Sequence, residues 1–183
     1  IEHFDLIYPY LGINAEILIG IGEEVIVTRP NLFGPLPEDI TKIVFKSIRY
    51  RKMVHTAEDL TAMILEREYN MGHAQLHSDV KHGFVLEFPE KPNLDITEVE
   101  AKVKNLINRE LDVSFVDETH IQIGDEEPFH CTGPRIHVRN TSEIENFQLI
   151  PVFKYNPISK VYALVGLVGS ERAVDINDLN RLT

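Results

Sequence analysis

The sequence is poor in several residue types, and each scarcity narrows the class of protein that it can encode. Among 183 residues there is one cysteine, Cys131, and no tryptophan. A single cysteine excludes an internal disulfide framework and is typical of a reducing compartment, so we expect a cytoplasmic protein. No apolar run approaches the roughly 20 residues of a membrane span, so we expect no membrane partner. The opening IEHFDLIYPY lacks the basic segment and cleavage site of a signal peptide, and we expect no export signal there.

Basic residues are also scarce, since 18 Lys and Arg stand against 29 Asp and Glu and give a net charge of −11. This balance argues against DNA or generic nucleic-acid binding, because phosphate contacts need a basic surface. Residues 42–52, KIVFKSIRYRK, are an exception to the acidic balance, since they contain no acidic residue and five basic ones: Lys42, Lys46, Arg49, Arg51 and Lys52. The segment is either the solvated face of a strand or a phosphate-contacting patch, and both interpretations stay open here.

The hydrophobic pattern predicts an α+β protein in two parts. Residues 15–29 are typical of two short strands joined around Gly20–Gly22, and the proline-rich loop RPNLFGPLPED follows them. We therefore predict a small N-terminal β-rich segment over residues 1–48 and a main domain over 49–183. Residues 42–50 alternate in the manner of a further strand.

Helical spacing in the main domain predicts two helices, over 56–69 and 97–111, the second opened by a T-x-x-E capping box at Thr97. Between them, HAQLHSDV and HGFVLEF predict a hairpin. The later stretches DVSFVDETHIQIG, HVRN, FQLIPVFKY and KVYALVGLV predict strands. Many strands with hairpin-length connections favour a two-layer sandwich, in which an antiparallel β-sheet carries the two main helices on one face.

Two separated stretches carry residues that can bind a metal. His55 and Asp59 are four residues apart in a predicted helix, so both side chains reach the same face. Cys131 and His137 flank a Gly-Pro turn. Together they supply nitrogen, oxygen and sulfur donors, a set that suits zinc. Taken singly, each stretch has a plainer interpretation, a surface pair for His55 and Asp59 and a small core residue for Cys131.

The same two stretches resemble the signatures of one family. HTAEDL, from His55, resembles the HTAEHL motif of the editing domain found in alanyl- and threonyl-tRNA synthetases and in the freestanding AlaX proteins. The preceding RYRKM resembles the lead-in to that motif. HCTGPRIHVRNTSEI resembles the family's second signature, a Cys-x-x-x-His followed by VRNTGEIG. The resemblance extends over roughly residues 49–168.

The resemblance implies a zinc ion beside the aminoacyl ester of a mischarged tRNA, with His55, Asp59, Cys131 and His137 as its ligands. Asp59 stands where the family has its second histidine, and the Cys131–His137 interval is two residues longer than the family's. His130 is an alternative ligand in place of Cys131 or His137. The resemblance also implies that His55 and His137 are the catalytic pair, which orients water and stabilises charge on the ester.

Contacts to the substrate and to tRNA are expected as well: the resemblance implies a substrate role for Gln75, the position after His137 suggests Arg139 and Thr141, and the basic charge before His55 suggests the tRNA contacts. The expected substrate-binding residues are Gln75, Arg139 and Thr141, and the expected tRNA-binding residues are Lys46, Arg49, Arg51 and Lys52. A plainer interpretation makes residues 139–141 a turn and a strand end. His73 and His77 are also four residues apart, but on a strand, and we expect them to be exposed.

Two classes of function follow, and tRNA is the expected partner. The first is a trans-acting aminoacyl-tRNA deacylase with zinc as its cofactor, favoured by the presence of His55, Cys131 and His137. The second is a catalytically degraded module of the same fold that binds tRNA or a protein, favoured by Asp59 and the longer Cys–His interval. A metal hydrolase of another small ester is a third possibility.

Overall fold

The chain forms two compact units, Ile1–Arg49 and Tyr50–Thr183, and the division falls inside its longest helix. The computed structural model describes residues 4–21, 25–34, 36–72, 75–80, 83–131 and 137–169. The sheets in these residues are antiparallel and the helices are separate from them in sequence, which confirms the predicted α+β class. No helix in these described ranges is both long and apolar enough to cross a membrane.

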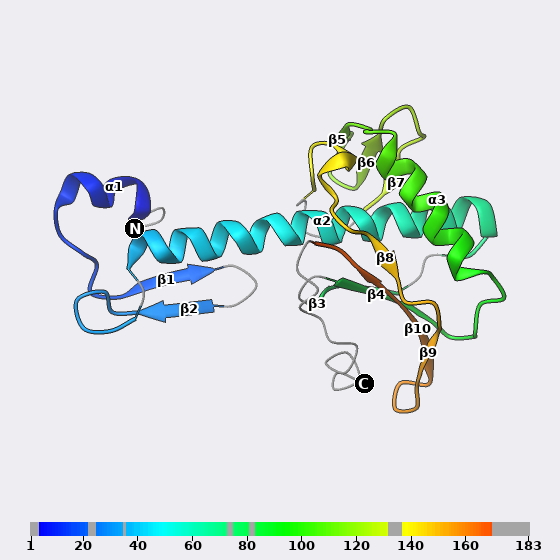
Figure 1. The fold of residues 1–183 in the computed structure, drawn as a ribbon, viewed down its shortest axis with the longest axis horizontal. Coiled ribbons are helices and arrows are strands. Elements are labelled where there is room, and N and C mark those ends of the chain that lie inside the picture. Colours follow the sequence, from blue (N-terminus) through cyan, green and yellow to red (C-terminus); the bar gives the residue numbers. More distant parts are fainter. Residues whose placement is uncertain are drawn as a thin grey trace. The chain divides into compact units, whose positions relative to one another are not determined.

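The elements follow one another along the chain as Figure 1 labels them. The helices are α1 (Phe4–Leu11), α2 (Pro37–Tyr69), α3 (Ile96–Asn108) and the short 3-10 helix η1 (Thr141–Glu143). The strands are β1 (Leu18–Ile21), β2 (Val25–Thr28), β3 (Gln75–Val80), β4 (Gly83–Phe88), β5 (Val113–Phe115), β6 (His120–Ile123), β7 (Phe129–His130), β8 (Gln148–Leu149), β9 (Lys154–Asn156) and β10 (Val161–Leu167).

The first unit is built on a two-stranded hairpin, β1–β2, as the pattern of residues 15–29 predicts. Gly20 lies on the face of the hairpin that meets the start of α2, where a Cβ atom would come within 2.5 Å of the Ile40 side chain and 3.3 Å of Val44. The absence of a side chain at Gly20 therefore allows the strand to approach the helix closely.

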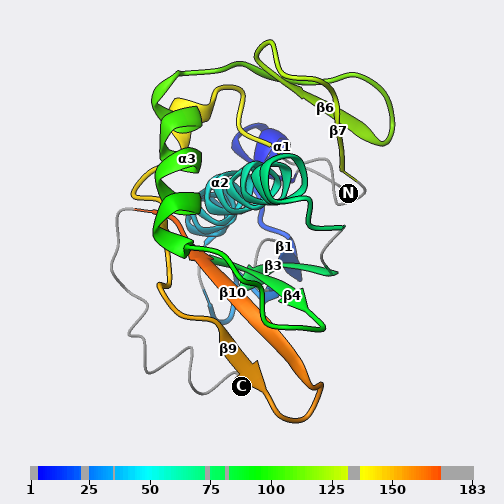
Figure 2. The same ribbon diagram turned by 90° about the vertical axis from the view of Figure 1, so that its right-hand side faces the viewer.

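The second unit holds a larger sheet in the order β3-β4-β10-β8, with β9 also paired to β10. The predicted hairpin is confirmed, because β3 pairs with β4, and KVYALVGLV forms the buried central strand β10. Figures 1 and 2 show α3 and the C-terminal half of α2 on the same side of this sheet. Side chains of both helices and of β4 and β10 form one hydrophobic core.

A polar cluster also joins α3 to the end of α2. The Lys102 ammonium lies 2.8 Å from carboxylate oxygens of both Glu68 and Glu98, and it donates a 3.2 Å hydrogen bond to the Tyr69 hydroxyl. Hydrogen bonding to Glu68, Glu98 and Tyr69 raises the pKa of Lys102 above its usual value. The lysine therefore stays charged and holds the two helices together at their surface.

The third sheet, β5-β6-β7, lies across α2 from the larger sheet, as Figures 1 and 2 both show. Every residue of α2 from Met53 to Leu65 is buried, because protein covers the helix on all sides there. Polar side chains within this stretch are removed from water, and their chemistry depends on what the surrounding elements bring to them.

Three local predictions are wrong. Residues 42–50 are not a strand but part of α2, whose start carries helix signals: Pro37 in its first position, then Glu38 and Asp39. The N-cap of α3 is Asp95, whose side chain accepts from the Thr97 N–H, so the T-x-x-E motif is not its capping box. The predicted strand HVRN, residues 137–140, contributes only an isolated bridge at its last residue.

Candidate metal centre

The first two donors come from one face of α2. His55 and Asp59 lie one helical turn apart, and His55 Nε2 is 3.8 Å from Asp59 Oδ2. Asp59 has 1% of its surface exposed and His55 has 6%. A carboxylate at this depth is costly unless a cation or hydrogen-bond donors face it, so the burial of Asp59 needs one or the other close by. The plainer interpretation of the pair as surface residues is wrong.

The third donor, Cys131, directly follows β7 at the end of the small sheet. Its backbone N–H donates to the Thr119 carbonyl at 2.8 Å, which fixes the end of the strand, and its Sγ lies 3.3 Å from His55 Nε2. His130 precedes it on β7 and is exposed, and its ring faces His120 with 5.4 Å between centroids. Successive residues of a strand point to opposite faces, so His130 does not replace Cys131 at the cluster.

The fourth donor, His137, is held against α2 by the residue that follows it. The Val138 N–H donates to Thr56 Oγ1 at 3.1 Å, and the Thr56 hydroxyl in turn donates to the Lys52 carbonyl at 2.8 Å. These bonds place the His137 ring over the turn that carries Asp59, and His137 Nε2 lies 2.8 Å from Asp59 Oδ2. Residues 132–136 lie outside the described residues.

The four donor atoms form a compact, buried group in which each atom lies within 4.8 Å of the others. His137 Nε2 is 3.7 Å from Cys131 Sγ, and the two imidazole rings are 4.4 Å apart between centroids. With zinc–nitrogen and zinc–sulfur bonds of about 2.1 and 2.3 Å, a tetrahedral site separates its donors by about 3.4–3.6 Å. Four of the six donor separations, at 2.8–3.8 Å, bracket this range and the other two are no longer than 4.8 Å, so the cluster can hold a metal ion if its donor atoms shift toward the ion.

The charges of the donors also fit a divalent cation. A cysteine thiolate and a carboxylate together carry two negative charges, and two neutral imidazoles add none. One divalent cation would therefore leave the buried group neutral. Cys131 and His137 converge with His55 and Asp59 although five residues separate them in the chain.

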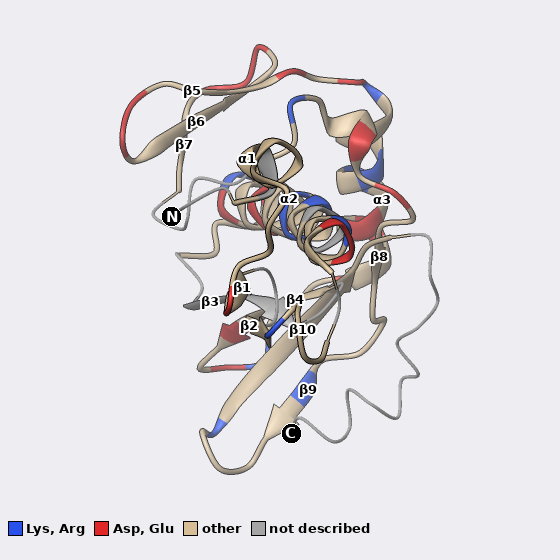
Figure 3. Cartoon of the chain, turned by 90° about the vertical axis from the view of Figure 1, so that its left-hand side faces the viewer, with Lys and Arg blue, Asp and Glu red and all other residues tan. Residues whose placement is uncertain are grey.

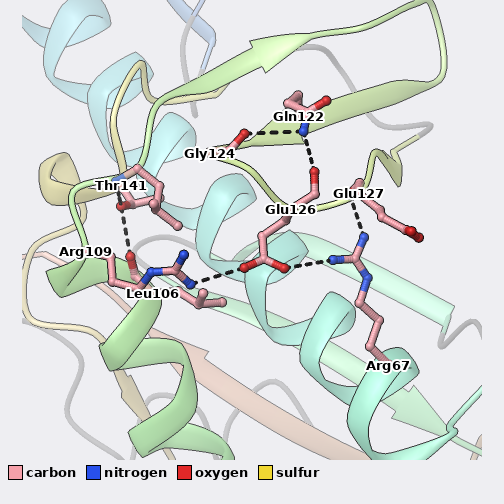
Figure 4. A network of polar contacts seen from close by, with 9 residues as sticks. Arg67, Leu106, Arg109, Gln122, Gly124, Glu126, Glu127 and Thr141 are labelled. Carbon is pink, nitrogen blue, oxygen red and sulfur yellow. Dashed lines mark hydrogen bonds and ion pairs between the residues drawn. The ribbon is translucent and has the colours of Figure 1, made fainter.

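A polar network holds the small sheet on the helices and so fixes the strand that leads to Cys131 (Figure 4). The Glu126 carboxylate forms ion pairs with Arg67 of α2 at 3.4 Å and with Arg109, at the end of α3, at 3.1 Å. Arg67 also donates to the Glu127 carbonyl at 2.6 Å. Gln122 of β6 donates to the Gly124 and Glu126 carbonyls and closes the turn before β7.

Two of the expected substrate-binding residues differ in burial, since Thr141 is buried and Arg139 is exposed. Thr141 is fully buried, and its hydroxyl donates to the Leu106 carbonyl at 3.1 Å and accepts from the Leu111 N–H, which ties η1 to the end of α3. Asn140 caps η1, and Arg139 precedes it with an exposed side chain. These contacts are structural, and the structure does not bring Thr141 into the metal cluster.

Several other predictions fall on residues whose side chains are outside the described part of the chain. The backbone of Gln75 pairs with Glu87 in the β3–β4 hairpin, but its side chain is not described. The same holds for the side chains of Lys46 and His77, and for His73 as a whole. The substrate role of Gln75 therefore stays a prediction.

The basic segment is helical and is divided between the two units. Lys42, Lys46 and Arg49 belong to the first unit. Arg51 and Lys52 belong to the second and precede His55 by four and three residues on α2, so their side chains lie on the His55 side of the helix. Figure 3 shows basic and acidic residues together along α2. Of the basic residues, only Arg51 and Lys52 are placed beside the cluster by the helix itself.

One aromatic residue at the cluster escaped the sequence analysis. The Phe115 ring of β5 meets the His137 ring edge to face, with 5.5 Å between centroids, although 49% of Phe115 is exposed. A half-exposed phenylalanine next to a buried polar cluster is an apolar surface available to a ligand. Its only signal in the sequence was its place in the predicted strand DVSFVDETH, where it follows the polar residue Ser114.

No protein-family model matches this chain, and no curated protein matches it.

Proposed function

We propose that the protein is a trans-acting aminoacyl-tRNA deacylase with zinc at the His55–Asp59–Cys131–His137 cluster. The observation that carries the proposal is the convergence of these four residues in one buried group. In the chain, His55 and Cys131 lie 76 residues apart, and Asp59 and His137 lie 78 residues apart. The stretches are those that resemble the two signatures of the tRNA-editing family, and the residues that converge are those at the signature positions.

Zinc in a protein site acts as a Lewis acid that activates water and polarises an ester carbonyl. The residues of the chain supply the surroundings for that chemistry. His55 and His137 offer neutral nitrogen donors, while Asp59 and Cys131 offer the negative charge that neutralises a divalent ion. Phe115 gives the His137 side of the cluster an apolar wall, against which the flat face of a terminal base or an apolar aminoacyl group can pack.

Arg51 and Lys52 support tRNA as the carrier of the ester. The pair lies one turn before His55, so cationic groups precede the cluster on the helix that carries it. In a chain of net charge −11, a polyanion is attracted only where basic residues are concentrated. A small uncharged ester would gain nothing from these two residues.

Four protein donors also describe a structural zinc site, since catalytic sites usually keep one position for water. The 2.8 Å contact between His137 and Asp59 favours a second candidate, a metal-free module that binds tRNA without hydrolysing it, because that contact satisfies both groups without an ion. Zinc content alone therefore does not test the hydrolysis.

The decisive experiment measures ester hydrolysis on a panel of correctly and wrongly charged tRNAs. We expect the zinc-loaded protein to release the amino acid from one class of mischarged tRNA, and we expect chelation to stop the reaction and added zinc to restore it. The variant His55→Ala should be inactive. Tight zinc binding without hydrolysis of any aminoacyl-tRNA would identify a structural site, and tRNA binding without zinc or hydrolysis would identify the binding module.

A further inference from the structure

The β1–β2 hairpin of the first unit carries an apolar face that the described residues leave exposed. Its five side chains, here called the hairpin face, are each between 56% and 70% exposed: Ile17, Ile19, Ile21, Val25 and Val27. The pairing register sets Ile19 opposite Val27 and Ile21 opposite Val25, so these branched side chains stand together on one side of the sheet.

The opposite side of the hairpin is already packed. Gly20 and Thr28 are buried, and Gly20 meets Ile40 of α2. A strand that is exposed on one face normally alternates apolar with polar residues, whereas a strand buried on both faces is apolar throughout. LIGI and VIVT follow the second pattern, although one of their faces is open to solvent.

The size and charge of the hairpin face fit a second copy of itself. Five branched side chains that are each more than half exposed present on the order of 500 Å² of apolar surface, the size of the largest patch on a typical monomer, which is often functional. Two such faces together bury about 1,000 Å², the lower end of what a specific interface needs. None of the five residues is charged, so the face itself adds no like-charge repulsion between two copies of a chain with a net charge of −11.

We propose that the hairpin face is a homodimer interface, on which the β1–β2 sheets of two copies pack face to face about a twofold axis. The same five residues contribute from each copy, as a twofold interface requires. The proposal is independent of the zinc cluster, because all five residues belong to the first unit.

Sedimentation equilibrium of the full chain over a range of micromolar concentrations tests it. We expect a dimer that dissociates on dilution. The double variant Ile19→Thr, Val27→Thr keeps branched, strand-favouring side chains and removes apolar surface, so it should weaken dimerisation at least about tenfold. The matched control is Ile158→Thr, because Ile158 is 88% exposed in the second unit, and it should dimerise like the parent.

Either of two results would overturn the proposal. The parent chain would be monomeric at every concentration if another part of the same chain, or a different protein, covers the face. A dimer that survives the double variant unchanged would use another surface. If the double variant loses its far-ultraviolet circular dichroism, Val25→Thr alone provides the same comparison at the other end of the face, and the dilution series of the parent needs no variant.

Discussion

His137 Nε2 lies 2.8 Å from Asp59 Oδ2, although 78 residues separate the two in the chain. Both side chains are almost entirely buried, Asp59 within the covered stretch of α2 and His137 against that helix. The contact joins a donor of α2 to a donor that follows β7 in the chain. Asp59 therefore lies within the cluster, where it is able to act as a ligand, rather than at a surface position.

Asp59→Asn should lower the affinity for zinc by at least about tenfold, because the amide has nearly the same shape but brings no negative charge to the ion. Competition with a chromogenic chelator measures this change. The buried amide can still accept a hydrogen bond from His137, so the fold should persist in circular dichroism. An unchanged zinc affinity would show that Asp59 is not a ligand and serves only to orient His137.

Phe115→Ala should raise the KM for a mischarged tRNA while leaving the zinc content at its parent value, since Phe115 contacts His137 through its ring and supplies no donor atom. Phe115→Tyr keeps the ring and should restore a KM close to that of the parent. A loss of zinc in Phe115→Ala would mean that the ring supports the His137 position instead of the substrate.

Arg51→Gln with Lys52→Gln should weaken tRNA binding and flatten its dependence on salt, because each charge removed from a phosphate reduces the slope of log K against log salt by roughly 0.7–0.9. Lys91→Gln with Lys160→Gln removes two exposed positive charges from loops of the same unit and is the matched control. Equal salt slopes in the two double variants would remove Arg51 and Lys52 from the tRNA-binding surface.

Glu126→Gln should destabilise the protein by about 0.5–1 kcal/mol, because it weakens the ion pairs with Arg67 and Arg109 in a partly exposed setting. Chemical denaturation measures the free energy of unfolding. Glu127→Gln is the control, since Arg67 uses the backbone carbonyl of Glu127 and not its carboxylate. Equal stability of the two variants would show that the carboxylate of Glu126 does not hold the small sheet on the helices.

The sequence allowed most strands and α3 to be predicted, because their patterns are local. The apolar stripe of α3 and the alternation in HGFVLEF were sufficient for each element. Residues 42–50 misled because KIVFKSIRY alternates like a strand while it continues a helix that begins at Pro37. The residues that start this helix lie in RPNLFGPLPED, which was predicted to be a loop because of its prolines and glycine. No helix-breaking residue lies between Pro37 and residues 42–50.

The candidate site was predictable in its residues but not in its geometry. His55 and Asp59 share a helix face, which spacing alone reveals, but nothing local places Cys131 or His137 against them. That placement depends on contacts distant in sequence, such as the bond from the Val138 N–H to Thr56 and the clamp formed by Glu126. Phe115 was missed for the same reason, since only its contact with His137, 22 positions away, places it at the site.

The number of zinc ions bound per chain tests the metal centre most directly. Purified protein is stripped with a chelator, and zinc is returned in a titration monitored by elemental analysis and chelator competition. We expect one zinc ion per chain for the parent and a loss of binding in Cys131→Ala, because no other cysteine in the sequence can supply the thiolate. A folded parent protein that takes up no zinc, or a Cys131→Ala variant that binds it as tightly as the parent, would contradict the assignment of the cluster as a metal centre.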